Sequence, residues 1–337
     1  MSDLASELAS IMGENAKQQE VSVWLDTGFA PLNKAISGRY DGGLPCGRMV
    51  EMFGGSSCGK TAIATVAMAH AQQMGGIAMF NDHEHSFDVG QGEGVGLDPR
   101  GAWIYKQPET FEESVDGAVK LARAVRSKKL IAPEAPIVAV FDSLASMVPQ
   151  SKLYDSKGNE KGAGDLSMHD NLALAKCTSS AFPALAQMAS KFNMLLLFLN
   201  QTRTKPGVMY GDPTTTPGGN APEYYASVRI QLTRSMLKDK SAGVTNGQDI
   251  KAYMKKNKVS TPFREANWRF MFRDDGSGYF DTVYSTLEHM KEIGLLPTSG
   301  AYVEFDGKKY HMGPLAKMIE DEGRLPELVS MLHALDS

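Results

Sequence analysis

The sequence predicts an α/β fold that is built on a mostly parallel β-sheet. From about Thr27 onward, short apolar runs alternate with stretches of helical periodicity, which is typical of parallel strands joined by crossover helices. Each apolar run is bounded by Gly, Asn, Asp or Gln at its carboxyl end, and two long loops rich in Gly, Pro and Thr follow such ends. Ligands of open α/β sheets bind at this edge, so we expect the functional site there.

Four apolar runs are the predicted core strands, and three helical stretches lie between them. Because these runs are almost entirely apolar, with Glu51 the one charged residue in them, we expect helices on both faces of the sheet. The strands are expected at Val50–Phe53, Ile77–Phe80, Ile137–Phe141 and Met194–Leu199, the helices at Thr61–Met74, Glu109–Ser127 and Asn171–Phe192, and two further strands at Val228–Leu232 and Trp268–Phe272.

The two ends of the chain are predicted to form smaller units around a core of residues 27–275. Residues 1–26 hold a short amphipathic helix followed by an alternating strand at 21–25. An arm of this kind docks on a neighbouring subunit or on its own domain. Residues 276–337 are predicted to form a small α+β domain, with helices at Phe280–Gly294 and Gly313–Leu335.

The composition excludes several classes of protein. The 337 residues are 42% hydrophobic and 22% charged, which is ordinary for a globular chain of about two domains. No apolar run approaches the ~18 residues of a membrane-spanning helix, and an acidic residue near the start disfavours a signal peptide. Three widely spaced cysteines disfavour a disulfide framework, so we expect a cytoplasmic protein. With a net charge of −4, any affinity for DNA must be local.

A phosphate-binding pattern follows the first core strand. The pattern is G-x-x-x-x-G-K-[ST], and it lies between a predicted strand and a predicted helix. Backbone N–H groups of such a loop face the phosphates of a nucleotide, and the helix dipole adds to this attraction. Lys60 is expected to reach the terminal phosphates, and Thr61 to offer its hydroxyl to Mg²⁺. The loop consists of Gly54, Gly55, Ser56, Ser57, Cys58, Gly59, Lys60 and Thr61.

Polar residues at the ends of other predicted strands complete the expected site. Asp142 closes the third strand, where a carboxylate holds Mg²⁺ through water. Glu84 follows the second strand and can orient and deprotonate the attacking water. Gln201 ends the fourth strand, where it can touch the γ-phosphate and pass its presence into the next loop. His83 and His85 flank Glu84, but their spacing does not fit a zinc site.

The two long loops span about residues 150–170 and 202–221, and the second holds the most specific pattern in the chain. From about Thr27 to about Gly313 the sequence resembles the RecA recombinase family, which includes bacterial RecA and phage UvsX-like recombinases. The resemblance rests on residues 200–213 (NQTRTKPGVMYGDP), 218–221 (GGNA) and 225–229 (YASVR), together with Leu44–Pro45, Gly47–Arg48, Glu84–His85, Asp142–Ser143 and Lys256–Lys258, which agree in order and spacing.

The resemblance implies roles for the residues of an ATPase site. Lys60 and Thr61 would bind phosphate and Mg²⁺, Asp142 would be the Walker B acid, Glu84 the water-activating carboxylate and Gln201 the nucleotide sensor. Asp88 matches a residue that contacts adenine. Lys256 and Lys258 resemble a lysine pair that reaches the ATP of the next subunit, so that hydrolysis takes place at an interface between subunits.

The resemblance also implies that both long loops bind DNA. Backbone N–H groups of glycines and an amide can hold phosphates without sequence preference, and a methionine can wedge between bases. Gly164, Asp165 and Met168 look like the first DNA-binding loop, with Lys176 just beyond, and Arg203, Lys205, Gly218, Gly219 and Asn220 look like the second. The implied protein is a DNA-dependent ATPase with ATP and Mg²⁺ as cofactors. It polymerises into a helical filament on single-stranded DNA and exchanges strands with homologous double-stranded DNA, without a membrane partner.

The sequence departs from the family pattern at several positions. Cys58 stands where bacterial members have serine, and Val89–Gln91 replaces a tyrosine that stacks on adenine. Pro206 and Thr214 replace an apolar DNA wedge and an acid that ties the loop to the nucleotide state. The chain ends without the acidic tail of many bacterial members. These departures favour a phage-type recombinase.

Three other functions share parts of this pattern. A hexameric helicase or motor with the same fold would need an additional loading domain. A small-molecule kinase with the same phosphate loop predicts a lid with arginines and no stimulation by DNA. A non-enzymatic filament protein that uses ATP as an adhesive has no need of a carboxylate at Glu84.

Overall fold

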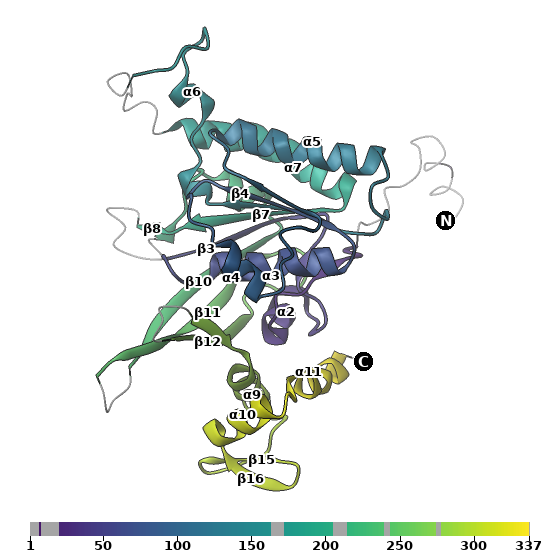
Figure 1. Cartoon of the computed structure of the whole chain (residues 1–337), viewed down its shortest axis with the longest axis vertical. Helices are drawn as coiled ribbons and strands as arrows, with labels where there is room; N and C mark the ends of the chain where they lie inside the picture. Colours follow the sequence, from purple (N-terminus) through teal and green to yellow (C-terminus); the bar gives the residue numbers. More distant parts are fainter. Residues whose placement is uncertain are drawn as a thin grey trace.

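A nine-stranded sheet dominates the part of the chain that the computed structural model describes, which comprises residues 7, 20–162, 172–204, 214–238, 243–273 and 278–336 (Figure 1). The strand order is β13-β12-β11-β10-β3-β7-β6-β4-β5. Neighbours from β10 to β5 run parallel, whereas β10 to β13 form an antiparallel meander. The strands are β3 (Met49–Gly54), β4 (Ile77–Asp82), β5 (Trp103–Lys106), β6 (Ile137–Asp142), β7 (Met194–Gln201), β10 (Val228–Lys238), β11 (Thr245–Asn257), β12 (Glu265–Phe272) and β13 (Gly278–Asp281).

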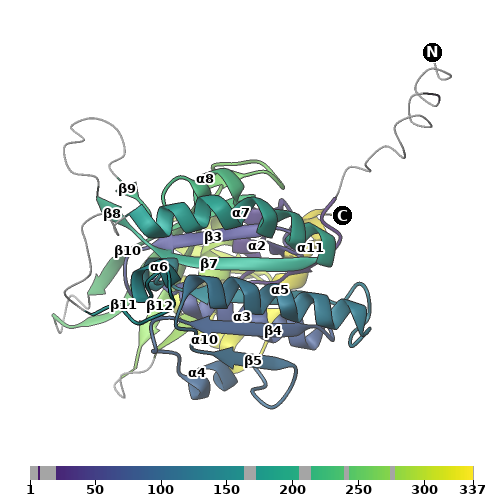
Figure 2. The same cartoon turned by 90° about the horizontal axis from the view of Figure 1, so that it is seen from above.

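Helices cover both faces of the parallel part of the sheet, as the apolar strands predict. Alternate residues of β7 face opposite sides, so Leu195 and Leu197 belong to one core cluster, and Leu196 and Phe198 to the other. Figure 2 shows α5 and α7 side by side over one face, and Figure 1 shows α3 on the other. The covering helices are α2 (Ala30–Ser37), α3 (Lys60–Gln73), α4 (Val89–Gly94), α5 (Phe111–Ser127) and α7 (Ala173–Phe192).

The predicted core strands and the three predicted helices are confirmed, but the strands extend further than expected. The polar residues Asp82, Asp142 and Gln201 still belong to the ladder, because pairing with the neighbouring strand continues beyond the last apolar side chain. Among the elements given above, β5, β11, β13, α2 and α4 were not predicted, and the start of the helix expected at Phe280–Gly294 belongs to β13. In β11, exposed and buried residues alternate without a continuous apolar run, so this strand lacks the signal used for the others.

Both long loops contain regular structure at their ends, which corrects the prediction that they are irregular throughout. The first begins with α6 (Gln150–Leu153), and a bridge joins Tyr154 to Glu160. The second contains the antiparallel pair β8 (Arg203–Thr204) and β9 (Thr214–Thr215) and leads to α8 (Ala221–Tyr225).

The amino-terminal strand pairs within its own chain. β1 (Trp24–Leu25) is antiparallel to β2 (Leu44–Pro45), so for this strand the structure selects docking on its own domain. The helix expected at 3–12 lies outside the described residues apart from Glu7. No helix in the described ranges is long and apolar enough to span a lipid bilayer.

The carboxyl-terminal part packs around a core of its own, which includes Leu287 and Leu328 (Figure 1). The single helix expected at Gly313–Leu335 is wrong. Gly323 adopts a φ of 65°, which reverses the chain between two helices, and Pro326 lies in the first turn of the second. The elements are α9 (Thr282–Glu292), β14 (Thr298–Ser299), β15 (Tyr302–Phe305), β16 (Lys308–His311), α10 (Met312–Asp321) and α11 (Leu325–His333).

A buried ion pair joins three central strands. Arg229 of β10 donates from Nε to Oε2 of Glu51 on β3 at 2.6 Å, and the two residues are 8% and 1% exposed. The other carboxylate oxygen of Glu51 accepts from Nδ2 of Asn200 on β7 at 2.8 Å. Arg229 Nη2 and Asn200 Nδ2 also donate to Thr216 and Pro217, at 3.3 and 3.0 Å. The pair therefore fixes the returning end of the second long loop to the core.

Replacing Glu51 by Gln should destabilise the fold strongly, because the buried guanidinium of Arg229 loses its buried countercharge and keeps only the exposed carboxylate of Glu223 at 3.9 Å. We expect a loss of about 3 kcal/mol in the free energy of unfolding, measured by urea denaturation. Glu265→Gln is the matched control, since it breaks the exposed pair of Glu265 with Lys251 on the same sheet. That control should cost less than about 1 kcal/mol. Equal losses from the two variants would contradict a structural role for the buried pair.

Candidate functional site

The loop between β3 and α3 has the geometry of an anion site. Gly59 precedes the first helical residue with a φ of 83°, and a Cβ at this position would lie 3.4 Å from Phe280 and 3.5 Å from Ile250. These are ordinary contact distances, so the positive φ, rather than lack of space, is what favours glycine here. Among the residues that the structure describes, no side chain caps the amino end of α3, so its first N–H groups are available to a ligand with negative charge.

Lys60 is folded back onto this loop. Its Nζ donates to the carbonyl of Gly55 at 2.8 Å and to that of Gly54 at 3.4 Å, and the side chain is buried. The thiol of Cys58 donates to Gly55 O at 2.9 Å, and burial raises its pKa above the ordinary value. Cys58 is thus a protonated packing residue, and in the described part of the chain the ammonium of Lys60 is held by neutral groups, the two carbonyls and the Cys58 sulfur at 3.7 Å. A phosphate would bind it more strongly than these acceptors do.

Thr61 and Asp142 meet at the start of α3 and the end of β6. The hydroxyl of Thr61 donates to Oδ2 of Asp142 at 2.7 Å. Burial raises the pKa of Asp142 to about 6, against the lowering effect of the bond from Thr61, and the nearby charge of Glu84 adds to the increase. A hydroxyl and a carboxylate are hard oxygen donors of the kind that Mg²⁺ prefers, so this pair fits the metal expected from the sequence.

The carboxylate of Glu84 joins the ends of three strands. Its Oε1 accepts from Ser143 Oγ at 2.6 Å and from Gln201 Nε2 at 3.0 Å, so residues just beyond β4 and β6 meet the last residue of β7. Glu84 itself is exposed, whereas Ser143 is fully buried. The structure therefore brings together Glu84 and Gln201, as the sequence predicts, and adds Ser143, for which the sequence analysis expected no role.

Asp82 was also missed, and it shapes the segment that carries Glu84. This carboxylate is 1% exposed and accepts from the backbone N–H groups of Glu84, Ser86 and Phe87 at 3.1, 3.0 and 3.0 Å. The hydroxyl of Tyr105 is a fourth donor at 2.9 Å. The signal in the sequence was an acidic residue at the end of an apolar strand, the same signal that identified Asp142.

His83 and Asp88 each make a local contact of their own. His83 is buried against Ser114, with Nε2 and Oγ 2.5 Å apart, and burial lowers its pKa to about 4, so the ring is neutral. Asp88 is exposed and caps α4 by accepting from the N–H of Gln91 at 3.1 Å. It shares no hydrogen bond with Glu84, Asp142 or the phosphate loop in the described residues.

Lys256 and Lys258 lie at the far end of the sheet from the phosphate loop of their own chain. In the strand register, Lys256 of β11 lies opposite Arg229 of β10, and Arg229 lies opposite Glu51 near the start of β3. The phosphate loop, in contrast, follows the end of β3. Nζ of Lys256 donates to the carbonyls of Glu223 and Tyr224 at the end of α8. Burial, and next the charge of Lys258, lower its pKa to about 8. These two lysines therefore do not belong to the phosphate site of the same chain.

The second expected DNA-binding loop contacts α7 at its returning end. Gly218 and Gly219 have φ values of 96° and 67°, and the carbonyl of Gly218 accepts from Thr178 Oγ1 at 2.7 Å. Lys176 is exposed on the same helix, and Arg203 is exposed on β8. Asn220 precedes the first residue of α8. The remaining expected contacts, Gly164, Asp165, Met168 and Lys205, lie outside the described residues.

The phosphate loop and the second DNA-binding loop border one hollow of about 300 Å³. Gly55 and Cys58 line it from one side, and Thr202, Arg203 and Thr214 line it from the other. A ligand on the phosphate loop is thus close to the segment between β7 and β9. The candidate nucleotide site and the candidate DNA interface are therefore adjacent.

Comparison with known proteins decides the family. The family model described as the RecA N-terminal domain matches residues 6–277. The chain belongs to the RecA family. Protein RecA of Bacteroides thetaiotaomicron is 35% identical over 96% of this chain and 89% of that protein. Protein RecA of Geobacter sulfurreducens is 35% identical over 92% and 83%, and that of Thermus aquaticus is 33% identical over 96% and 86%. The RecA-type core makes the chain a nucleotide-binding NTPase, and neither the hexameric motor nor the small-molecule kinase is favoured.

Asp142→Asn should stabilise the protein in the absence of nucleotide and metal. The folded pKa of Asp142, about 6, lies above the ordinary value of 3.8. Its contribution to stability is therefore lost as the pH rises between about 4 and 6, and the buried charge costs stability at neutral pH. We expect the variant to gain about 1–3 kcal/mol at pH 7.5 in urea denaturation, and less at pH 4.5. Exposed Asp116→Asn is the control, expected within ~0.5 kcal/mol of wild type. A loss of stability at pH 7.5 would contradict the assigned burial cost.

Proposed function

We propose that this chain is an ATP-dependent recombinase that assembles on single-stranded DNA and exchanges strands with a homologous duplex. Membership of the RecA family supports the recombinase assignment. The observation that supports it most directly within the structure is the contact of Glu84 with Gln201, because Gln201 is the last residue before the second DNA-binding loop. A change in the bound nucleotide would therefore reach the DNA-binding loop through two neighbouring residues, Glu84 and Gln201.

In ATP hydrolysis, the phosphate loop would bind the phosphates, and residues at the strand ends would help to hold the metal and activate the water. The uncapped N–H groups of α3 and the ammonium of Lys60 would hold the phosphates. Thr61 and Asp142 would hold Mg²⁺, which offsets the negative charge of the phosphate oxygens. Glu84 would accept the proton of the attacking water, oriented by the bonds from Ser143 and Gln201.

Gln201 would act as the sensor of the γ-phosphate. Its Nε2 donates to Glu84, and a γ-phosphate placed beside Glu84 would compete for the same donor. Thr202, the next residue, borders the hollow shared with the phosphate loop, so a shift of Gln201 toward the phosphate would be passed on to the backbone there. The bound nucleotide would in this way change the second DNA-binding loop, with Arg203 the first cation to follow.

A filament would complete each ATP site from two subunits. Lys256 and Lys258 cannot serve the phosphate loop of their own chain, but they lie at the edge where a head-to-tail neighbour would present its loop. The proposal assigns residues 1–26 to an arm, 27–275 to the ATPase core and 276–337 to a small carboxyl-terminal domain. Many subunits along one strand add weak local contacts, so a chain with a net charge of −4 can still bind DNA.

Glu84→Gln should separate binding from hydrolysis. For wild type, we expect ATP turnover to rise at least about tenfold when single-stranded DNA is added. The variant should keep its affinity for ATP and DNA and lose on the order of 10²–10⁴ in turnover, because an amide cannot accept the proton. Turnover is measured by phosphate release and DNA binding by fluorescence anisotropy. Exposed Glu93→Gln is the matched control. DNA-independent hydrolysis by a stable monomer would instead favour the kinase alternative.

Two inactive variants should complement each other if sites are shared between subunits. Lys60→Ala removes the phosphate-binding lysine of one side, and Lys256→Ala removes the cation that we assign to the other. In an equal mixture with single-stranded DNA, about a quarter of the interfaces would combine two intact sides. We expect ATP turnover to recover to about that fraction of wild type. Absence of recovery, with mixed filaments visible by electron microscopy, would contradict a shared site.

A further inference from the structure

The side chain of Gln248, on β11, donates a hydrogen bond to the backbone of the phosphate loop. Its side chain is 2% exposed, and Nε2 donates to the carbonyl of Ser57 at 2.7 Å. On the other side of the same amide, Oε1 accepts from Nη1 of Arg234 at 3.1 Å. Because a guanidinium only donates hydrogen bonds, Arg234 fixes the orientation of the amide, with Nε2 toward the loop. Nothing in the phosphate-binding pattern of residues 54–61 indicates this contact.

The carbonyl that Gln248 holds belongs to a strained part of the loop. Ser57 adopts a φ of 56°, a region that residues other than glycine rarely enter. Such a conformation persists where the surroundings hold it. In a trans peptide the C=O of Ser57 and the N–H of Cys58 point in opposite directions. A bond that fixes the Ser57 carbonyl on β11 therefore also fixes the direction of the next N–H group, on the side away from β11.

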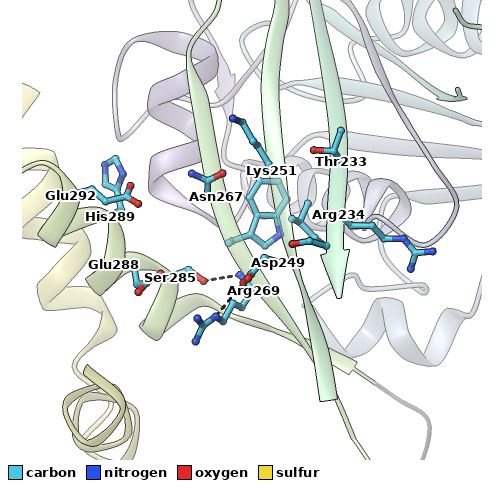
Figure 3. Close-up of a pocket in the computed structure, with 13 residues that line it drawn as sticks. Thr233, Arg234, Asp249, Lys251, Asn267, Arg269, Ser285, Glu288, His289 and Glu292 are labelled. Atoms are coloured by element: carbon cyan, nitrogen blue, oxygen red, sulfur yellow. Dashed lines mark hydrogen bonds and ion pairs between the residues drawn. The ribbon is translucent and has the colours of Figure 1, made fainter. Parts of the chain in front are cut away.

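Arg234 reaches Gln248 across the sheet. In the register of β10 and β11, Arg234 lies opposite Ile250 and is the diagonal neighbour of Gln248. Arg234 is exposed, and it lines both the hollow beside the phosphate loop and a cleft of about 410 Å³ between the sheet and α9. Figure 3 shows its side chain extending from β10 away from Glu288 and His289 of α9. Its guanidinium is thus directed away from α9.

We propose that Gln248 is a positioning residue for the phosphate loop, and that Arg234 orients its amide. This inference rests on the proposed binding of ATP to residues 54–61. Gln248 touches no reacting atom. It holds the Ser57–Cys58 peptide in the orientation that binds phosphate, so the loop rearranges less when a nucleotide binds. The bond therefore strengthens nucleotide affinity and does not change the rate of the chemical step.

The test is a titration of wild type and variants with MgADP in the absence of DNA. Gln248→Glu places a carboxylate oxygen against the Ser57 carbonyl, and we expect about tenfold weaker binding. Gln248→Met removes the bond without the repulsion, and about threefold is expected. In DNA-stimulated turnover both variants should raise the KM for ATP with kcat nearly unchanged. A merely structural defect would reduce the active fraction, and so kcat, and leave KM as it is.

A double-mutant cycle tests the role of Arg234. Arg234→Met should weaken MgADP binding by about twofold in wild type and have no effect in the Gln248→Met background, since no amide remains to be oriented. Asp249→Asn is the matched control, because it changes the next residue of β11, on the opposite face, and should bind MgADP like wild type. Unchanged affinity in Gln248→Glu, with wild type binding normally, would overturn the role of Gln248. A wild-type chain that binds no MgADP would overturn the proposed function itself.

Discussion

The shared carboxylate oxygen of Glu84 depends on a single constraint, the parallel order of β4, β6 and β7. In the ladder, Phe80 is level with Val140, and Val140 is level with Leu197, so the three chains leave the sheet at neighbouring points of one edge. Ser143 and Gln201 can reach the same oxygen only because of this order. The phosphate loop leaves the same edge from β3. The site is therefore a consequence of sheet topology, and the loops need only supply short polar side chains.

The same order explains how much of the site the sequence could predict. Glu84, Asp142 and Gln201 were identified because each follows an apolar run, and parallel strands end at one edge. Gln248 could not be found in this way, because its contact with Ser57 joins residues 191 positions apart and β11 has no apolar run. The pairing of Glu51 with Arg229 could not be found either. Each charge stands inside a predicted strand, but the two residues are 178 positions apart and nothing in the sequence shows that they meet. The roles of Lys256 and Lys258 came only from the family resemblance.

Stability and function oppose each other at Asp142. Burial raises its pKa to about 6, so the folded chain without ligand carries an unfavourable buried charge at neutral pH. A divalent cation between Asp142 and Thr61 would remove that cost. The free energy so regained would add to the affinity of the site for the metal. In the proposed function, a bound cation would thus offset a cost that the fold carries, a common pattern at functional positions. Asp82 shows the contrast, because four donors already satisfy its buried carboxylate.

Lys60 and Lys256, which would lie on opposite sides of the proposed shared site, have similar hydrogen bonds. Lys60 donates to the carbonyls of the phosphate loop, and Lys256 to the carbonyls that end α8. Both acceptors are neutral, so a triphosphate between two subunits would draw both ammonium groups away from them. For Lys256 this exchange frees the end of α8, the helix that directly follows Gly218, Gly219 and Asn220. In the proposed filament, binding of ATP by one subunit would therefore alter the DNA-binding loop of its neighbour, through the lysine that completes the site.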